Sequence, residues 1–452
     1  DAPISEAGWT TEKFFLLRDL LKNYLPAGES LPEVPAALPV IEIPEIHFNK
    51  VAPLFSNLPE AKQTVDIQPM EQFNQGWGTI LYRTTLPEAT LAGTVLKITE
   101  VHDWAQIYAD GKLLARLDRR KGEFTTTLPA LKKGTQLDIL VEAMGRVNFD
   151  KSIHDRKGIT EKVELVSGNQ AKELKNWTVY NFPVDYSFIK DKKYNDTKIL
   201  PSMPAYYKST FKLDKVGDTF LDMSTWGKGM VWVNGHAMGR FWEIGPQQTL
   251  FMPGCWLKEG ENEILVLDLK GPAKASIKGL KKPILDVLRE KAPETHRKDG
   301  EKLKLAGEKV THEGAFTPGN GWQEVRFAAP AKGRYFCLEA LSPQANDNIA
   351  AVAEFDVLGV DGKPVSREHW KIRYANSEET RSGNRTADKI FDLQESTFWM
   401  TVDNVPYPHQ LVIDLSKVET VTGFRYLPRA EKEYPGMIKE YRVYVKSADF
   451  NY

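Results

Sequence analysis

The acidic, thiol and imidazole side chains of this chain fall into no recognisable catalytic motif. The sequence has 61 Asp and Glu residues, 8 His and 2 Cys among 452 residues. It lacks a Gly-x-Ser-x-Gly nucleophile elbow and a His-Glu-x-x-His metal motif. No Gly-rich phosphate loop follows a predicted strand, and the histidines lack the spacing of metal ligands. A lone histidine such as His102 or His236 is therefore interpreted as structural.

Length and composition limit what the chain can be. With 41% hydrophobic and 11% aromatic residues it should fold, into roughly two to four domains. The net charge of −1 gives no reason to expect a nucleic-acid partner. The longest apolar runs have about six residues, too few to span a membrane. Cys255 and Cys337 fall in different predicted domains, so we expect two buried, reduced thiols and no disulfide.

The chain is organised around residues 218–269, which predict an antiparallel sheet. Short apolar runs alternate there with glycines, a pattern typical of strands. Asn234-Gly235 separates two of these runs and predicts a hairpin, because both central positions of a type I′ turn need positive φ. The same stretch contains Trp226, Trp232, Trp242 and Trp256.

This stretch closely resembles a signature of the family 35 glycoside hydrolases, the β-galactosidases. The resemblance rests on WGKG, VNGHAMGRFW, GPQQTLFMPGCWL and GENEI, and on the preceding phrase MPAYYKSTFKL. In that family these residues build a galactose-binding-like jelly roll. The resemblance implies a scaffold rather than a working sugar site.

The N-terminal residues resemble the end of the catalytic (β/α)8 barrel of the same family. DAPISEAG is followed by apolar residues at helical spacing, Phe14, Leu17, Leu21 and Leu25. The family carries its two catalytic glutamates upstream of this motif, so the resemblance implies that neither is in this chain. A retaining glycosidase needs two carboxyl groups about 5 Å apart, and no motif here pairs two acids in that way. Asp1 is expected at the rim of the substrate site.

Residues 49–170 predict a first β-sandwich, and residues 171–273 the galactose-binding-like jelly roll. Short strands alternate with turns, and Asp110-Gly111 marks a hairpin. MEQFNQGWGTILYRT and VEAMGRVNFD are similar to phrases of the family's first β-domain. In the family's counterpart of the second phrase, a tyrosine touches the sugar. Phe149 stands at that position, and a phenyl ring can stack on a sugar but cannot donate a hydrogen bond. The resemblance implies a substrate-rim role for Phe149, and packing is the alternative.

Two linkers are expected. By the resemblance, residues 1–25 are the end of the catalytic barrel with its last helix. The prolines of residues 26–48 then predict an extended, semi-rigid linker. Residues 274–302 are charge-rich, with a short helix expected from Pro283 to Lys291. The apolar stripe of residues 1–25 lacks the barrel that would cover it, so it should fray, self-associate or dock onto a neighbouring domain.

Residues 303–452 resemble the discoidin or coagulation-factor type C modules, with their pieces in an unusual order. TADKIFDLQESTFWMT, PHQLVIDLSKVETVTGFRYLPR and IKEYRVYVK are similar to the first half of such a module. Phrases of the second half, GRYFCLEALS and NIAAVAEFDVLG, come earlier. We interpret this order as a circular permutation, which a jelly roll tolerates when its ends lie close together. The strand near 441–446 should then lie where a short hairpin could join it to the strand near Val325.

This second resemblance also implies ligand sites. Such modules often bind calcium in the loop matched by residues 387–397, where Asp392 takes the first acidic position and Gln394 the second. Glu440 could supply another carboxylate, so a structural Ca²⁺ is one prediction, and a loop held by its own hydrogen bonds is the alternative. Some modules bind galactose through exposed side chains, and the candidates are Trp399, His409, Arg429 and Tyr434.

The patterns together predict an all-β fold of tandem jelly-roll, galactose-binding-like β-sandwiches, with a remnant helix of a (β/α)8 barrel. The function expected is that of the non-barrel part of a retaining β-galactosidase, which supports its own catalytic barrel and binds β-galactoside-containing glycans without a required cofactor. A homodimer and a secreted or periplasmic location are further expectations. A stand-alone glycan-binding module without catalysis is the alternative, and a protein–protein interaction module stays open.

Overall fold

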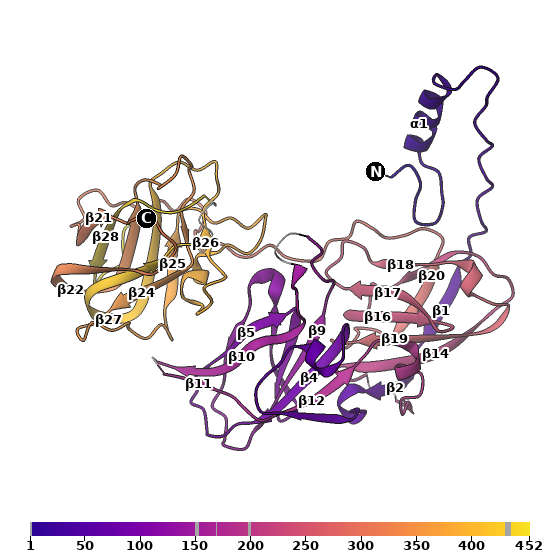
Figure 1. Ribbon diagram of the computed structural model, residues 1–452, viewed down its shortest axis with the longest axis horizontal. Coiled ribbons are helices and arrows are strands. Elements are labelled where there is room, and N and C mark those ends of the chain that lie inside the picture. Colours follow the sequence, from indigo (N-terminus) through magenta and orange to yellow (C-terminus); the bar gives the residue numbers. More distant parts are fainter. Residues whose placement is uncertain (1, 150–152, 169, 198–199, 430–434) are drawn as a thin grey trace. The chain divides into compact units, whose positions relative to one another are not determined.

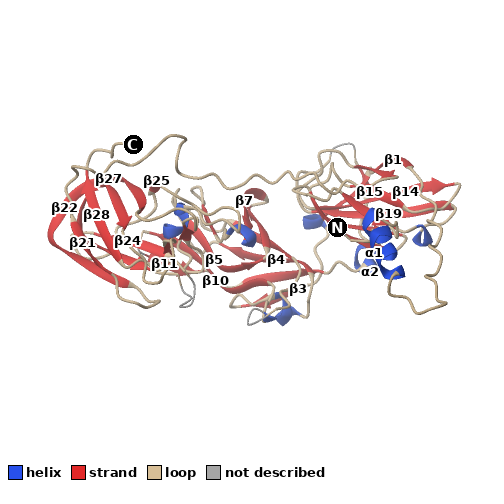
Figure 2. Cartoon of the chain, turned by 90° about the horizontal axis from the view of Figure 1, so that it is seen from above, coloured by secondary structure: helices blue, strands red, loops and turns tan. Residues whose placement is uncertain are grey.

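The computed structural model describes residues 2–149, 153–168, 170–197, 200–429 and 435–452. They form mostly antiparallel strands (Figures 1 and 2), so the all-β prediction is confirmed. Two α-helices occur among them, α1 (Glu12–Lys22) and α2 (Tyr186–Ile189), and neither has the length and apolar character that a membrane crossing needs. The chain divides into two compact units, residues 1–59 with 183–291 and residues 60–182 with 292–452.

The first unit contains a four-stranded and a six-stranded sheet. Its core is rich in aromatic rings: Trp226 packs edge-on against Phe48 and Tyr207, with centroids 5.2 and 5.1 Å apart. Large buried rings supply much of the hydrophobic stabilisation of such a core. The four-stranded sheet runs in the order β1 (Ile43–His47), β20 (Ser276–Leu280), β15 (Thr219–Asp222), β18 (Thr249–Met252). The six-stranded sheet runs in the order β13 (Asn195–Asp196), β2 (Lys50–Pro53), β14 (Ala205–Leu213), β19 (Gly260–Asp268), β16 (Lys228–Val233), β17 (His236–Trp242).

Strands from outside the expected jelly roll complete this unit and move the expected boundaries. β1 lies in the expected linker and β2 in the expected first sandwich, yet they pair with β20 and β14. Conversely, β11 (Gln170–Glu173) and β12 (Trp177–Phe182) join sheets of the second unit. The sheet that a strand joins is set by its hydrogen-bond partners, which its own residues specify only weakly.

Both expected hairpins form. Asn234 and Gly235, with φ of 49° and 88°, join β16 to β17. Asp110 and Gly111, with φ of 45° and 78°, join β6 (Trp104–Ala109) to β7 (Lys112–Asp118). Positive φ at both central residues is the property for which Asn-Gly and Asp-Gly turns are suited.

The helix expected from Pro283 to Lys291 does not form. Residues 284–291 have no regular secondary structure and lie along a neighbouring loop, where Val287 N donates to Pro246 O (3.0 Å) and Arg289 N to Ile244 O (2.7 Å). The loop therefore satisfies backbone groups that a helix would have paired internally. Helix propensity is a weak guide where such tertiary hydrogen bonds compete with it.

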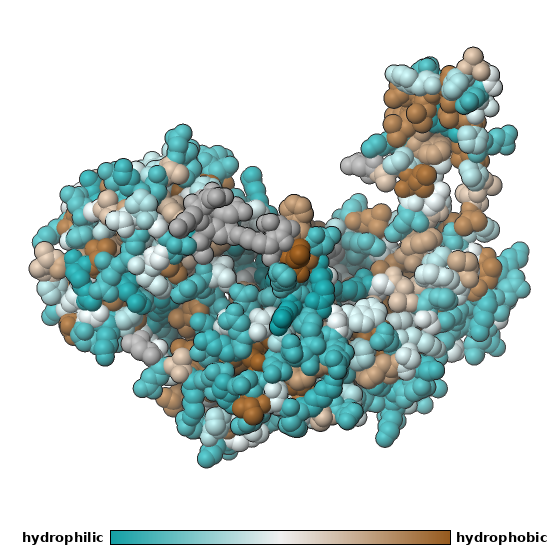
Figure 3. Space-filling view, viewed as in Figure 1, coloured by the Kyte–Doolittle hydropathy of each residue, from teal (hydrophilic) through white to brown (hydrophobic). Residues whose placement is uncertain are grey.

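α1 forms between Thr11 at its N-cap and Asn23 at its C-cap, and it leaves its apolar face uncovered. None of its residues is buried, and Leu17 and Leu21 of the expected stripe are 41% and 54% exposed. Brown side chains gather over this helix in Figure 3. The helix is intact, and its apolar side chains do not dock into the described part of the chain, so the expectations of fraying and docking were wrong and self-association stays a prediction.

The second unit begins with a β-sandwich that occupies residues 60–182. In β5 (Val95–His102), Leu96 and Ile98 are fully buried, whereas Val95 and Lys97 are half-exposed. This alternation is typical of a sheet with one face on the core. One sheet runs in the order β3 (Ala61–Thr64), β12, β4 (Gly78–Thr85), β9 (Gln136–Ala143), β6, β7. The other runs in the order β11, β10 (Gly158–Ser167), β5, β8 (Thr125–Thr127).

Residues 303–452 form another sandwich in the second unit. In its larger sheet Ala340 lies opposite Tyr441, so the strands that contain them are neighbours, as a circular permutation requires. The permutation itself stays a prediction. The larger sheet runs β21 (His312–Ala315), β28 (Glu440–Lys446), β22 (Gln323–Ala340), β27 (His409–Leu427), β24 (Glu354–Leu358), with β25 (Lys371–Ala375) also paired to β27, and the smaller contains β23 (Ala351–Val352) and β26 (Trp399–Met400).

Short elements and the cysteines complete the description. Cys337 is buried and Cys255 is exposed, and both are free. The expected absence of a disulfide is thus confirmed, but the expected burial of Cys255 was wrong. Short 3₁₀ helices are η1 (Leu54–Ser56), η2 (Met70–Phe73), η3 (Arg119–Lys121), η5 (Gly254–Trp256) and η6 (Ala387–Phe391).

Candidate functional site

Phe149, the expected substrate-rim residue, lies on a loop that is anchored behind its exposed tip. Its side chain is 80% exposed. Behind it, Arg146 donates to Asp155 O (2.8 Å) and Gly76 O (2.7 Å), and Val147 N donates to Asp155 Oδ2 (3.1 Å). An exposed ring on an anchored loop can stack on a ligand at little cost in ordering. Packing, the alternative role for Phe149, does not fit this exposure.

A buried ionic network anchors the Phe149 loop. The fully buried Lys157 ammonium lies 2.7 Å from Asp103 Oδ2 and 2.7 Å from Asp155 Oδ2. The Arg119 guanidinium lies 2.7 Å from the other oxygen of each carboxylate. Burial alone would raise the pKa of Asp155, but its hydrogen bonds from Lys157 and Arg119 outweigh burial and lower that pKa to about 2. Two cations thus balance two carboxylates, which makes the buried charges tolerable.

Two of the expected sugar-binding side chains belong to the core. Trp399 is 1% exposed, and its Nε1–H donates to Ser377 O (2.9 Å). His409 is fully buried and bonds Asn348 O through Nε2 (2.6 Å). Neither side chain can reach a sugar, so these two predictions were wrong. Aromatic residues fill cores as readily as they line binding sites, and their type alone does not separate the two roles.

The remaining candidates differ in what can be said of them. Arg429 is half-exposed and lies over the ring of Phe398, 4.3 Å from its centroid. This cation–π contact leaves Arg429 as a candidate at the surface. Asp1 and Tyr434 lie outside the described residues.

Asp392 lies in the expected calcium loop, directly after η6, beside an acid other than Glu440. Asp392 accepts hydrogen bonds from Gln394 N (3.0 Å) and Thr397 Oγ1 (2.8 Å). Burial raises the pKa of Glu354, and it stays raised although the charge of Arg367 lowers it; the charge of Asp392 adds to the rise, as expected for two carboxylates that lie near each other. Sequence reasoning missed Glu354, although it lies in the phrase NIAAVAEFDVLG that carried the resemblance.

Glu440 was the wrong partner. It lies at the start of β28, where Ser342 Oγ donates to its Oε2 at 2.9 Å. Asp392 belongs to the segment after η6, and nothing in the described contacts brings it to Glu440. Glu440 was chosen as a carboxylate within the phrase IKEYRVYVK that resembles the module, and membership of a motif does not fix which side chains meet in a sandwich.

The residues around Glu354 and Asp392 fit a cation in part. Glu354 Oε1 is buried without a hydrogen-bond partner, and a cation would satisfy it. Its other oxygen is paired with Arg367, and Lys389 Nζ lies 3.8 Å from Asp392 Oδ2. In the described part of the chain no group of three or more His, Cys, Asp or Glu side chains could hold a metal. Calcium would therefore need backbone and hydroxyl oxygens in addition to the two carboxylates.

These buried acid pairs do not form a glycosidase centre. Asp103 and Asp155 are each 2% exposed or less and are neutralised by two cations. The Glu354 side chain is 2% exposed and paired with Arg367. A glycosidase needs one accessible nucleophile and one acid/base beside the sugar, and neither pair offers this.

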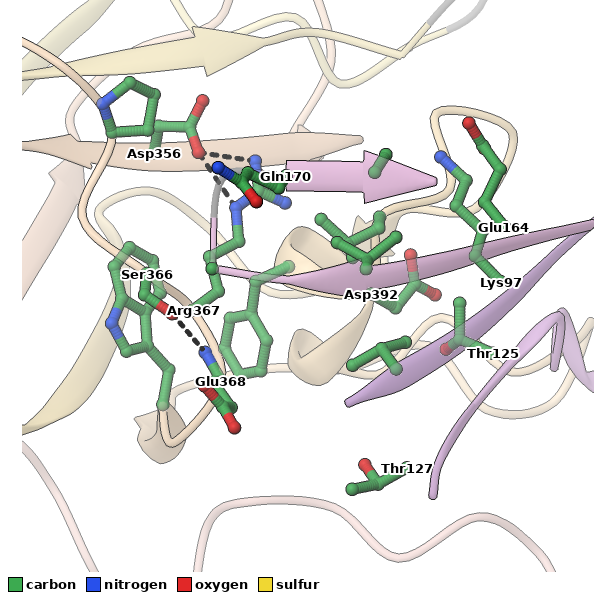
Figure 4. A pocket seen from close by; sticks show the side chains of 18 of the residues that line it. Lys97, Thr125, Thr127, Glu164, Gln170, Asp356, Ser366, Arg367, Glu368 and Asp392 are labelled. Carbon is green, nitrogen blue, oxygen red and sulfur yellow. Dashed lines mark hydrogen bonds and ion pairs between the residues drawn. The ribbon is translucent and has the colours of Figure 1, made fainter. Parts of the chain in front are cut away.

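A cleft of about 850 Å³ opens in the second unit, between the β11–β10–β5–β8 sheet and the sandwich of residues 303–452. Figure 4 shows Thr125 and Thr127 on the sheet side and Ser366 and Glu368 on the facing segment. Thr125 is paired with Lys97, and cross-strand partners share a face. The sheet thus turns its polar outer face toward the cleft.

The facing wall is held by an ionic cluster. Asp356 is ion-paired with both Arg367 and Arg425, and dashed lines mark contacts of Asp356 in Figure 4. Trp370 also lines the wall, is 6% exposed, and leaves its indole N–H without a hydrogen-bond partner. Asp392 reaches the same cleft. The wall is therefore fixed by charge pairs but has one unsatisfied buried donor.

Comparison with known proteins assigns these regions. Residues 68–183 match the "Beta-galactosidase, first all-beta domain", residues 204–262 the "Beta-galactosidase, galactose-binding domain", and residues 374–452 the "F5/8 type C domain". Two regions of the chain thus match domains of β-galactosidases, and a third matches a different module. Phe149 lies within the first all-beta domain, and the cleft lies between this domain and the sandwich that includes the F5/8 type C match.

Curated β-galactosidases are similar to this chain over part of their length. "Beta-galactosidase 1" of Dictyostelium discoideum is 32% identical, over 59% of this chain and 44% of that protein. "Beta-galactosidase" of Bos taurus is 33% identical, over 66% of this chain and 49% of that protein. The chain thus spans less than half the length of these relatives. Among solved structures, a lectin from Pleurotus ostreatus in complex with GalNAc matches with 12% identity over 51% of this chain and 80% of the lectin, at a TM-score of only 0.19.

Proposed function

We propose that this chain is the non-catalytic part of a β-galactosidase, and that its first β-domain forms part of the rim of the galactoside site. The hydrolysis, with retention, of terminal β-galactosyl residues belongs in this proposal to two carboxylates of a catalytic barrel. The observation that carries the rim role is the 80% exposed ring of Phe149 on its anchored loop, inside the region that matches the first all-beta domain. Stacking on a sugar face is the contact such a ring can make.

The exposed face of α1 supports the same proposal. Leu16, Leu20 and Leu21 are each more than half exposed on one short helix. Contiguous exposed apolar side chains mark a contact surface. In our proposal the catalytic barrel covers this face. We also propose that the protein forms a homodimer, and analytical ultracentrifugation of its oligomeric state tests this.

The rim role is tested by kinetics on the protein together with its barrel. Phe149→Ala should lower kcat/KM for a β-galactoside about fivefold, the loss of one stacking contact worth about 1 kcal/mol. Phe149→Tyr should retain activity, because the ring is kept. Val65→Ala removes an apolar side chain that is 62% exposed on the same sandwich and serves as the matched control. Unchanged kinetics in Phe149→Ala would remove the rim role.

The non-catalytic assignment has its own test. The chain of 452 residues, purified alone, should not hydrolyse a chromogenic β-galactoside. Hydrolysis that is lost on substitution of one of its own acids would overturn the assignment. The alternative, a glycan-binding module without catalysis, predicts heat of binding with galactose or lactose and no effect of Phe149→Ala on any hydrolysis.

Calcium and location complete the proposal. We propose a structural Ca²⁺ at Glu354 and Asp392, supported by the unpartnered Glu354 Oε1 and by the two buried carboxylates. No other cofactor is proposed. A secreted or periplasmic location is proposed as well, and cell fractionation tests it.

A further inference from the structure

We propose that the cleft between the outer face of the β11–β10–β5–β8 sheet and the 356–393 wall is a binding site for a neutral oligosaccharide. This site is separate from the Phe149 rim and needs no hydrolysis. It can therefore fail while the β-galactosidase proposal stands, and the reverse also holds.

The size of the cleft suits a small ligand. Its volume of about 850 Å³ lies within the roughly 300–1,000 Å³ of typical small-molecule sites. One wall is a hydrogen-bonded sheet and the other is fixed by the ion pairs of Asp356. A ligand would meet preformed walls, which lowers the entropic cost of binding.

The charge of the lining favours a neutral ligand. Five cationic side chains line the cleft together with five carboxylates. Much of this charge is paired within the walls: Lys162 lies 3.0 Å from Glu164, and Asp356 holds two arginines. Neither sign of charge dominates, so a polyanionic or polycationic partner gains no net attraction. The carboxylates, ammonium groups and amide remain good hydrogen-bond partners for sugar hydroxyls.

The unsatisfied polar groups also point to a hydroxyl-bearing ligand. The hydroxyls of Thr125 and Thr127 lie on the sheet side, and neither has a hydrogen bond to the described residues. The Trp370 N–H is buried and unpartnered, which costs stability unless a ligand or water accepts from it. Trp370 also stands edge-on to Phe391, with centroids 5.9 Å apart, so apolar ring edges accompany the donors. Apolar edges beside hydroxyl partners are what a sugar ring requires.

Contacts at two places hold the two walls together. Gly93 packs on the Glu368 carboxylate, which would have to move to admit a Cβ at this position. A Cβ on Gly122 would lie 2.6 Å from Thr397 Cγ2. Near that second contact, Asn384 Nδ2 donates to Lys121 O at 3.2 Å. The cleft is therefore closed at these contacts and open between them.

The experiment is calorimetric titration of the full chain with β-linked galacto-oligosaccharides, from the disaccharide to the hexasaccharide, with cello-oligosaccharides and a sulfated galactan for comparison. Thr125→Trp should block the cleft and abolish binding. Trp370→Phe replaces the indole by a smaller phenyl ring and so loses the N–H, and it should weaken binding about fivefold, equivalent to about 1 kcal/mol. Thr178→Trp, at a half-exposed threonine of β12 outside the cleft, is the matched control and should bind normally.

Hydrogen exchange with and without the bound oligosaccharide should show added protection in β5, β8 and β10. Absence of binding by any neutral oligosaccharide at millimolar concentration would overturn the proposal. So would binding that Thr125→Trp and Trp370→Phe leave unchanged, or binding of the sulfated galactan alone. Circular dichroism of both variants checks that they fold, and the Trp370→Phe variant keeps the test valid if Thr125→Trp does not.

Discussion

Lys157→Met should be among the most destabilising single substitutions in the first β-domain. The Lys157 side chain is 0% exposed, and its ammonium touches Asp103 and Asp155 at 2.7 Å each and Gly145 O at 3.1 Å. Methionine nearly fills the same space but leaves two buried carboxylates with Arg119 as their remaining cation. Breaking a buried ion pair by removing one partner costs about 3–5 kcal/mol. We expect a loss of that size in the free energy of unfolding of this sandwich.

The assay is urea unfolding followed by hydrogen exchange in β4 and β9, because these central strands report on this sandwich alone. The control is Lys175→Met, since Lys175 also contacts two carboxylates, Asp66 at 2.7 Å and Glu173 at 2.6 Å, but its side chain is 40% exposed. Solvent screens that pair, so the control should change little. Equal, small effects of the two substitutions would refute the reasoning that burial makes the Lys157 cluster critical.

Three further outcomes are expected. Burial opposes the charge of His296, but its hydrogen bond with Glu378 outweighs burial and raises the pKa of His296. The stability contributed by this pair should therefore be full below about pH 6.5 and decline as pH rises through the raised pKa. Hydrogen exchange of residues 292–300 should show the same pH dependence, and Glu378→Gln should abolish that dependence. Trp399→Ala should cost about 3–5 kcal/mol in thermal unfolding without altering oligosaccharide binding, because Trp399 is core. Calcium at 100 times its Kd should stabilise the chain by about 2.7 kcal/mol, and Glu354→Gln should remove that gain, whereas a gain that survives would place the ion elsewhere.

The sequence predicted the local parts of the fold well. Asn234-Gly235 and Asp110-Gly111 turn where expected, because positive φ at two successive residues is a requirement that few dipeptides meet. The apolar runs become buried strands, since burial follows hydrophobicity directly. The helix α1 also forms within its predicted stretch, whose residues have helical spacing.

The failures concern what each segment meets in space. β1 and β2 were placed in other regions because a strand's partner is set by the whole sheet, not by its own residues. Pro283 suits the first turn of a helix over residues 283–291, but the 244–248 loop offers these residues hydrogen bonds instead. Trp399 and His409 were read as exposed because the same side chains serve both surface and core.

The candidate site shows the same division. Asp392 was identified from its motif, and it does lie in a buried acidic site. Its partner Glu354 lies 38 positions earlier in the chain, at the start of β24. Only the sandwich brings them together, with the charge of one raising the pKa of the other. A sequence motif can identify one residue of a site, but the fold determines which other residues lie beside it.

The order of strands in the last sandwich follows from how its ends meet. β28, the last strand, lies between β21 and β22, which come first in this region. Lys304 N donates to Asn451 O (2.9 Å), so the beginning and the end of the sandwich form a bridge. A short connection across that bridge would restore the usual order of the resembled module without moving a strand. Because the entropic cost of closing a loop rises only slowly with its length, and the two ends lie together, the same residues can reach the same sandwich in either order. Residues 303–360, which precede the F5/8 type C match at 374–452, contribute β21, β22 and β24 to the same sheet as β27 and β28, as the predicted permutation requires.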